Sequence, residues 1–136
     1  MSDFCYNVLA LIPVETDFRV ANVVETFIAD GQPASLATSP AGSCVGFRVV
    51  YTDNWGIVAW FEDDVDIVTE NQEIMGVFGN PPNVAADATV ECDRRLSIWS
   101  DDDSDMMNAH LFEEYIGFLK EKLGLYIFDS VQGIWR

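Results

Sequence analysis

The sequence predicts an α+β fold, a two-layer sandwich in which helices pack on one mixed or antiparallel sheet. Three observations support this prediction. The chain has 136 residues, which fits a single domain, 1–136, with one core. Its hydrophobic content of 49% argues against disorder despite the high charge. Segments with helical and strand periodicity follow one another in the order β-α-β-β-α-β-α-β, without an internal repeat or a linker.

The chain opens with a predicted strand and helix. Residues 4–12 form a continuous apolar run that stops at Pro13, as in a strand covered on both faces. Thr16 or Asp17 is the expected N-cap of a helix over residues 18–29. This segment therefore supplies one strand and one helix of the sandwich.

A loop, a hairpin and a second helix are expected next. Residues 33–43 are mostly small and fit a loop. Residues 44–51 and 55–61 alternate apolar side chains on either side of a turn at 52–54, as in a β-hairpin. Both faces of the hairpin carry apolar residues, so its strands are expected to be central. Residues 65–78 repeat apolar side chains at helical spacing and predict the second helix.

The longest predicted strand covers residues 88–99. Apolar and polar side chains alternate along it until Arg94 breaks the pattern, so a bulge is expected at 93–95. The polar side should be solvated, which places the strand at an edge or leaves one of its faces uncovered.

The final helix has the clearest pattern in the chain. Its N-cap is expected at Ser104 or Asp105, and Gly124 stands where a glycine ends a helix. The apolar stripe is Phe112, Ile116, Leu119 and Leu123. Gly117 inside this helix costs about 1 kcal/mol relative to alanine, so it either permits a close approach or has no role. Short strands at 125–128 and 134–135 complete the sheet.

The net charge of −16 is concentrated in the middle of the chain. Residues 53–105 hold 14 acidic side chains against only two basic ones, Arg94 and Arg95. Such a field repels nucleic acid and anionic membranes and attracts basic proteins. The expected partner is therefore a basic protein, a toxin or a DNA-binding protein, and neither nucleic acid nor a membrane.

The cysteines and the N-terminus indicate a cytoplasmic protein. Cys5, Cys44 and Cys92 are odd in number and far apart, so buried free thiols are expected. No cysteine and histidine spacing suggests zinc. The first residues lack a signal peptide's basic region, and Val8–Val14 is too short to span a membrane, so we expect a complete, cytoplasmic chain.

Two acidic runs follow predicted strands, at 62–66 and 101–105. If those strands end on the same side of the sheet, eight carboxylates share one rim. The runs could be solvated caps and loops, a docking surface for a basic protein, or a divalent-cation site. The glycine and distal glutamate of an EF-hand loop are absent.

Tryptophan could anchor such a docking surface. Trp55, Trp60 and Trp135 fit the core or its edge, although Trp55 stands in a turn, whereas Trp99 adjoins the aspartate run. The expected partner-binding residues are therefore Glu62, Asp63, Asp64, Asp66, Trp99, Asp101, Asp102, Asp103 and Asp105.

No motif in the chain predicts catalysis or a cofactor. There is no glycine-rich phosphate loop, nucleophile elbow or basic patch. His110 shares a helix face with Glu113 and Glu114, as in some metal sites, but the same residues fit a solvated face. We therefore expect neither enzymatic activity, nor a bound metal, nor a cofactor.

Residues 96–136 combine a strand, the acidic run Trp99-Ser-Asp-Asp-Asp, an amphipathic helix and the segment Gly124-Leu-Tyr-Ile-Phe-Asp-Ser-Val-Gln-Gly. This arrangement resembles small bacterial immunity proteins of polymorphic-toxin systems. The resemblance implies a cytoplasmic, non-enzymatic, acidic inhibitor of a cognate toxin, and it assigns no role to any single residue.

The leading hypothesis is a non-catalytic acidic protein-binding inhibitor, an immunity protein that neutralises a basic, nuclease-type toxin. One alternative is a phage-encoded nucleic-acid mimic that inhibits a DNA-binding defence protein, for which the carboxylates should follow one elongated surface. The other is a small metal-dependent enzyme that uses the aspartate cluster.

Overall fold

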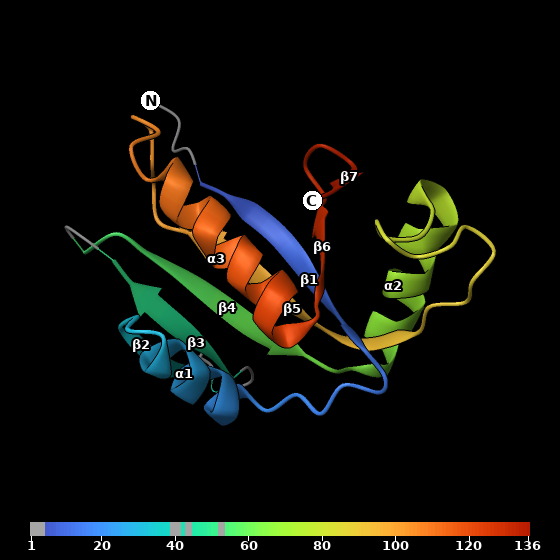
Figure 1. Cartoon of the computed structure of the whole chain (residues 1–136), viewed down its shortest axis with the longest axis horizontal. Coiled ribbons are helices and arrows are strands. Elements are labelled where there is room, and N and C mark those ends of the chain that lie inside the picture. Colours follow the sequence, from blue (N-terminus) through green and yellow to red (C-terminus); the bar gives the residue numbers. More distant parts are fainter. Residues whose placement is uncertain (1–4, 39–41, 43–44, 52–53) are drawn as a thin grey trace.

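The computed structural model describes residues 5–38, 42, 45–51 and 54–136, which build one seven-stranded antiparallel sheet with three helices (Figure 1). The strands are β1 Asn7–Pro13, β2 Ala34–Thr38, β3 Val45–Val50, β4 Gly56–Glu62, β5 Cys92–Ser100, β6 Tyr126–Asp129 and β7 Ile134–Trp135. The helices are α1 Val20–Ala29, α2 Val65–Phe78 and α3 Ala109–Leu123. Across the sheet the order is β2-β3-β4-β5-β1-β6-β7. The predicted α+β class of helices on a sheet is confirmed.

The main core lies between one face of the sheet and helices α1 and α3. Phe27 of α1 packs against Tyr115 and Phe118 of α3, with its ring centroid 5.5 and 4.2 Å from theirs. Leu96 and Ile98 of β5 point into the same core and are fully buried. The aromatic layer therefore joins two helices that are distant in the sequence.

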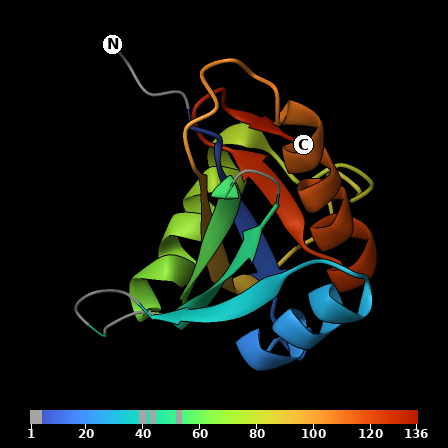
Figure 2. The same cartoon turned by 90° about the vertical axis from the view of Figure 1, so that its left-hand side faces the viewer.

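Helix α2 packs on the opposite face of the sheet (Figure 2). Phe78 at its end lies 4.9 Å from the ring of Phe128 in β6, and the buried Asn71 donates to the carbonyl oxygen of Cys92 at 3.0 Å. Strand β1 lies between the layers, so Leu11 and Ile12 are both fully buried, as the continuous apolar run predicts. Helix α2 leaves the outer face of β3 and β4 uncovered.

Several local predictions are confirmed. Helix α2 has the predicted bounds, and Gly124 ends α3 with a left-handed φ of 67°. In the pairing of β1 with β5, Ile12 faces Arg94 but Pro13 faces Cys92, so Asp93 is the extra residue of the expected bulge.

The predicted loop at 33–43 is wrong in its first half, because residues 34–38 form β2 at the edge of the sheet. Small residues such as Ala34 and Ala37 have weak strand propensity, and pairing with β3 overrides it. Part of the expected turn, residues 52 and 53, lies outside the described residues.

The predicted N-caps are also wrong. Helix α1 begins after Arg19 rather than Thr16 or Asp17, and α3 begins after Asn108 rather than Ser104 or Asp105. In neither case does the capping side chain bond to the helix backbone. Long-range contacts hold the segments that lead into both helices, as when the Arg94 guanidinium donates to the carbonyl oxygens of residues 13 and 16 at 2.8 Å.

Candidate functional site

The two acidic runs lie at opposite ends of the sheet. Strands β4 and β5 are antiparallel, with Ile57 facing Ser100 and Glu62 facing Arg95. Five residues separate these two rungs, which is about 17 Å along a strand. The expectation that eight carboxylates share one rim is therefore wrong, because neighbouring antiparallel strands end at opposite edges.

Asp101 ties the β3–β4 hairpin to the end of β5. Its carboxylate accepts from the Arg48 guanidinium at 2.6 Å and from the Gly56 backbone N–H at 2.9 Å. Its carbonyl oxygen accepts from Nε1 of Trp55, which is only 5% exposed. Trp55 is therefore a core residue, and Asp101 is already engaged within the fold.

Asp103 holds the segment before α3 against the N-terminal end of β1. This aspartate is 4% exposed, and its carboxylate accepts from the Tyr6 hydroxyl at 2.7 Å. The same carboxylate accepts from the Asn108 backbone N–H at 3.1 Å. Asp102 and Asp105 are exposed, so these two carry the solvent-facing charge of this run.

The other acidic run surrounds the start of α2. Glu62, the last residue of β4, accepts from the Arg95 guanidinium at 3.1 Å. Glu70 of α2 accepts from the same guanidinium at 2.9 Å. Asp63, Asp64 and Asp66 are exposed at the positive end of the α2 dipole, where carboxylates are stabilised. Three exposed carboxylates, without an ion pair within the described residues, therefore project from this end of the sheet.

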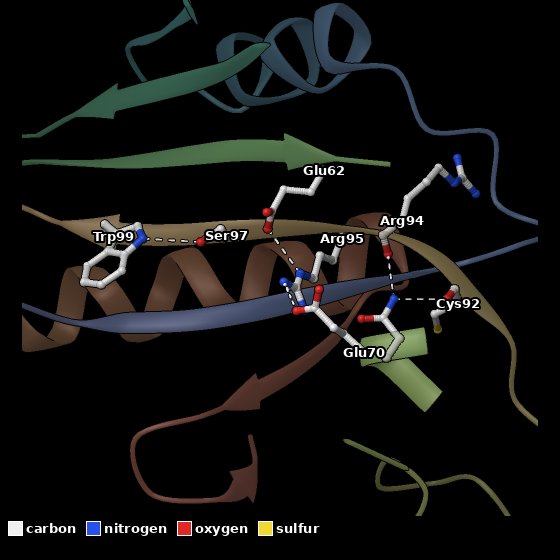
Figure 3. A network of polar contacts seen from close by, with 8 residues as sticks. Glu62, Glu70, Cys92, Arg94, Arg95, Ser97 and Trp99 are labelled. Carbon is white, nitrogen blue, oxygen red and sulfur yellow. Dashed lines mark hydrogen bonds and ion pairs between the residues drawn. The ribbon is translucent and has the colours of Figure 1, made fainter. Parts of the chain in front are cut away.

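Between these ends lies a surface that we call the open face, comprising Gly46, Arg48, Val58, Trp60, Ser97 and Trp99. Trp99 faces Val58 across the β4–β5 ladder, and Trp60 faces Ser97 on the next rung. The Trp99 side chain is 46% exposed and donates to the Ser97 hydroxyl at 3.3 Å. Figure 3 shows this pair on β5, the strand that also carries Arg95, whose guanidinium binds Glu62 of β4 and Glu70 of α2.

Trp60 faces Gly46 across the β3–β4 ladder. A side chain at residue 46 would place its Cβ 3.0 Å from the Trp60 ring and 2.0 Å from the carbonyl oxygen of Ala59. Glycine is therefore required at residue 46, and its lack of a side chain allows the Trp60 ring to approach β3 closely. The open face thus carries a half-buried indole and an exposed one on diagonal positions of neighbouring strands.

Sequence reasoning finds Trp99 but not Trp60. Apolar residues on both sides of the 55–61 strand predict cover on both faces, and the strand is indeed central. Helix α2, however, packs beyond it over β5, β1 and β6. The apolar pattern of Val58 and Trp60 was thus the available signal for an unburied apolar surface.

The remaining sequence candidates lie elsewhere. His110 and Glu114 are exposed on α3, and Glu113 pairs with Arg136. A Cβ at Gly117 would meet no atom within 4 Å, so no described part of the chain makes the close approach that this glycine would permit.

The cysteines differ from one another. Cys92 is buried as expected, and burial raises the pKa of its thiol to about 12. Cys5 is exposed, so its expected burial is wrong, because it precedes β1 and lies outside the sheet. Cys44 lies outside the described residues.

No family model, curated protein or solved structure matches this chain. Within the described residues, no three His, Cys, Asp or Glu side chains gather closely enough to hold a metal ion. The same part of the chain contains no helix with the length and apolar character needed to cross a bilayer.

Proposed function

We propose that this chain is a non-catalytic protein that binds a basic protein through the open face. The observation that carries the proposal is the apolar strip of Trp60 and Trp99 on an uncovered sheet face, with carboxylates at both ends. An exposed indole next to a half-buried one, with acidic groups nearby, provides an apolar anchor and electrostatic complementarity in one surface.

The charge balance indicates the sign of the partner. All five arginines of the chain are in ion pairs within the described residues, including Arg48 with Asp101 and Arg95 with Glu62. Few cations remain to neutralise the exposed carboxylates, and the net charge is −16. A partner with a basic surface gains attraction from this field, whereas an acidic one is repelled.

In the most specific form of the proposal, the chain is an immunity protein that neutralises a basic nuclease toxin in the cytoplasm. The support is the acidic open face and the resemblance of residues 96–136 to small immunity proteins. Binding would block the toxin by covering its basic, nucleic-acid-binding surface. This role requires tight association and no catalytic group.

A nucleic-acid mimic is the second candidate, and the separation of the acidic runs favours it. Asp63 and Asp102 belong to opposite ends of the β4–β5 ladder rather than to one compact rim. Negative charge at two separated positions fits the extended binding surface of a DNA-binding protein better than a compact cluster does. The activity of the captured partner separates the candidates: a partner that degrades nucleic acid supports the immunity protein, whereas a DNA-binding protein without nuclease activity supports the mimic.

Affinity capture tests the proposal. The immobilised protein is exposed to lysate of its source cell at low salt and eluted with a salt gradient. We expect a basic protein to be retained by the wild type and lost with Trp99→Ser. The control is Val131→Ser, which removes a side chain that is 78% exposed in the β6–β7 turn. Equal retention of that protein by wild type and Trp99→Ser, or no retained basic protein, would overturn the proposal.

A further inference from the structure

We infer that the free edge of β2 accepts an added β-strand from the basic partner, and that this strand is rich in lysine or arginine. The inference rests on the proposed function, since it specifies how the same partner extends its contact. It is carried by the main chain of β2, and the tryptophans of the open face play no part in it.

Strand β2 is the outermost strand at one side of the sheet, and within the described residues it pairs with β3 alone (Figure 2). The opposite edge is β7, which has only two residues. Very short edge strands offer little template for pairing, whereas a five-residue edge such as β2 offers a full ladder.

The hydrogen-bond register identifies which groups of β2 face outwards. The Val50 N–H donates to the carbonyl oxygen of Pro33 at 3.2 Å, so residues 33 and 50 are a hydrogen-bonded pair. Bonded and non-bonded pairs alternate in an antiparallel ladder, which makes Ser35 and Ala37 the next residues to bond β3. The N–H and C=O groups of Leu36 therefore point away from the sheet, as do those of Thr38.

The side chains of β2 do not protect this edge. Natural edge strands are commonly blocked by lysine, proline, a bulge or inward-pointing charge. Residues 34–38 read Ala-Ser-Leu-Ala-Thr, without charge or proline, and pair with β3 in unbroken register. Leu36 is 60% exposed although it faces the same side as buried Phe47. Helix α1 therefore covers the face of the sheet but not this end of it.

Charge decides between a strand of the partner and a second copy of this chain. Pairing of two β2 edges would bring together two molecules that each carry −16. A strand with basic side chains gains attraction from the same field. Addition of a strand supplies main-chain hydrogen bonds, and its side chains supply selectivity.

Amide hydrogen exchange with a defined peptide tests the inference. The probe is a ten-residue peptide of alternating valine and lysine. At about ten times its Kd, the edge amides of Leu36 and Thr38 should exchange about tenfold more slowly. A peptide N-methylated on alternate residues loses the donors that face β2 and should not protect these amides. A valine and glutamate peptide should bind more weakly than the basic one.

Two protein variants separate the edge from the open face. Leu36→Pro removes an outward N–H together with the leucine side chain and should abolish protection at Thr38. Leu36→Ala removes the side chain but keeps the N–H, and it should preserve that protection. Trp99→Ser should leave peptide protection unchanged. Should Leu36→Pro unfold, the N-methylated peptide provides the same comparison on the intact protein.

Three results would overturn the inference: a bound peptide without slower exchange at Leu36 and Thr38, equal protection by the N-methylated peptide, or dimerisation that protects the same amides in the peptide's absence. If the peptide fails while the basic protein is still captured through Trp99, only the edge inference fails. Loss of both results would remove the proposed function as well.

Discussion

Asp103 is a buried carboxylate that joins two distant segments of the chain. It accepts from Tyr6 near the N-terminus and from Asn108 at the start of α3. Asp102, the preceding residue in the chain, is exposed and accepts from the Ser104 hydroxyl. Adjacent aspartates therefore differ in role, and a run of identical letters does not reveal which of them faces inwards.

Replacement of Asp103 by alanine should lower the free energy of unfolding by about 1–3 kcal/mol. The Tyr6 hydroxyl and the Asn108 N–H would both lose their acceptor. Asp102→Ala removes the same charge at an exposed position and should change stability by less than about 0.5 kcal/mol. Urea denaturation of both variants measures the difference. Equal losses would contradict the assigned role of Asp103.

The tyrosines predict a loss of stability at alkaline pH. Burial, followed by the hydrogen bond and charge of Asp103, raises the pKa of Tyr6 to about 12 from an ordinary value of 10.0. Burial also raises the pKa of Tyr51, Tyr115 and Tyr126. Between these values the unfolded chain releases protons that the folded chain retains, so the folded state loses stability as the pH rises.

We therefore expect the urea midpoint to be constant up to about pH 9 and to fall between about pH 10 and 12. Tyrosinate absorbance should rise with the unfolding transition rather than before it. Ionisation of all four tyrosines near pH 10.0 in the folded protein would contradict the burial of Tyr115.

At the scale of elements, sequence periodicity predicts what is local. The bounds of α2 and the C-terminal end of α3 at Gly124 follow from spacing and from glycine's tolerance of positive φ. Spacing does not predict strand β2, because pairing with β3 decides it. Nor does spacing predict the first residues of α1 and α3, because side-chain bonds to other segments decide where these helices begin. The direction of β4 relative to β5, which separates the acidic runs, is also a property of the sheet and not of either strand.

Two glycines of the last helix should respond to alanine with opposite signs. Gly117 lies inside α3, and an alanine Cβ there would meet no described atom within 4 Å, so Gly117→Ala should stabilise the fold by up to about 1 kcal/mol. Gly124 has a φ of 67°, so Gly124→Ala should destabilise it by about 1 kcal/mol. Thermal or urea unfolding measures both. A loss of stability in Gly117→Ala would show that the fold itself needs this glycine.

At the scale of the whole molecule, the candidate site is a product of topology. Sequence alone indicates strong acid, Trp99 and the absence of catalytic motifs. Only the fold brings Trp60 beside Trp99, assigns Asp101 and Asp103 to internal bonds and leaves the outer face of β3 and β4 uncovered. The sequence does not reveal these features because long-range strand pairing decides which side chains remain exposed, and no short motif encodes that pairing.

The central claim is that charge brings the basic partner to the open face and that tryptophan retains it. Association kinetics of the captured partner test this claim most directly. The first variant neutralises Asp63, Asp64 and Asp66 to asparagine near the open face. The matched control neutralises three exposed carboxylates on the α1 and α3 side: Asp30→Asn, Glu114→Gln and Glu121→Gln. A third variant is Trp99→Ser.

At low salt, the first variant should associate about tenfold more slowly than the wild type, and its control should be slowed less. The reason is that the field strength near the docking surface sets the encounter rate. Trp99→Ser should associate at the wild-type rate and dissociate about tenfold or more faster, as truncation of an anchor residue costs about 2 kcal/mol. Equal slowing by the two charge variants, or an unchanged dissociation rate in Trp99→Ser, would contradict the assignment of the open face as the binding surface.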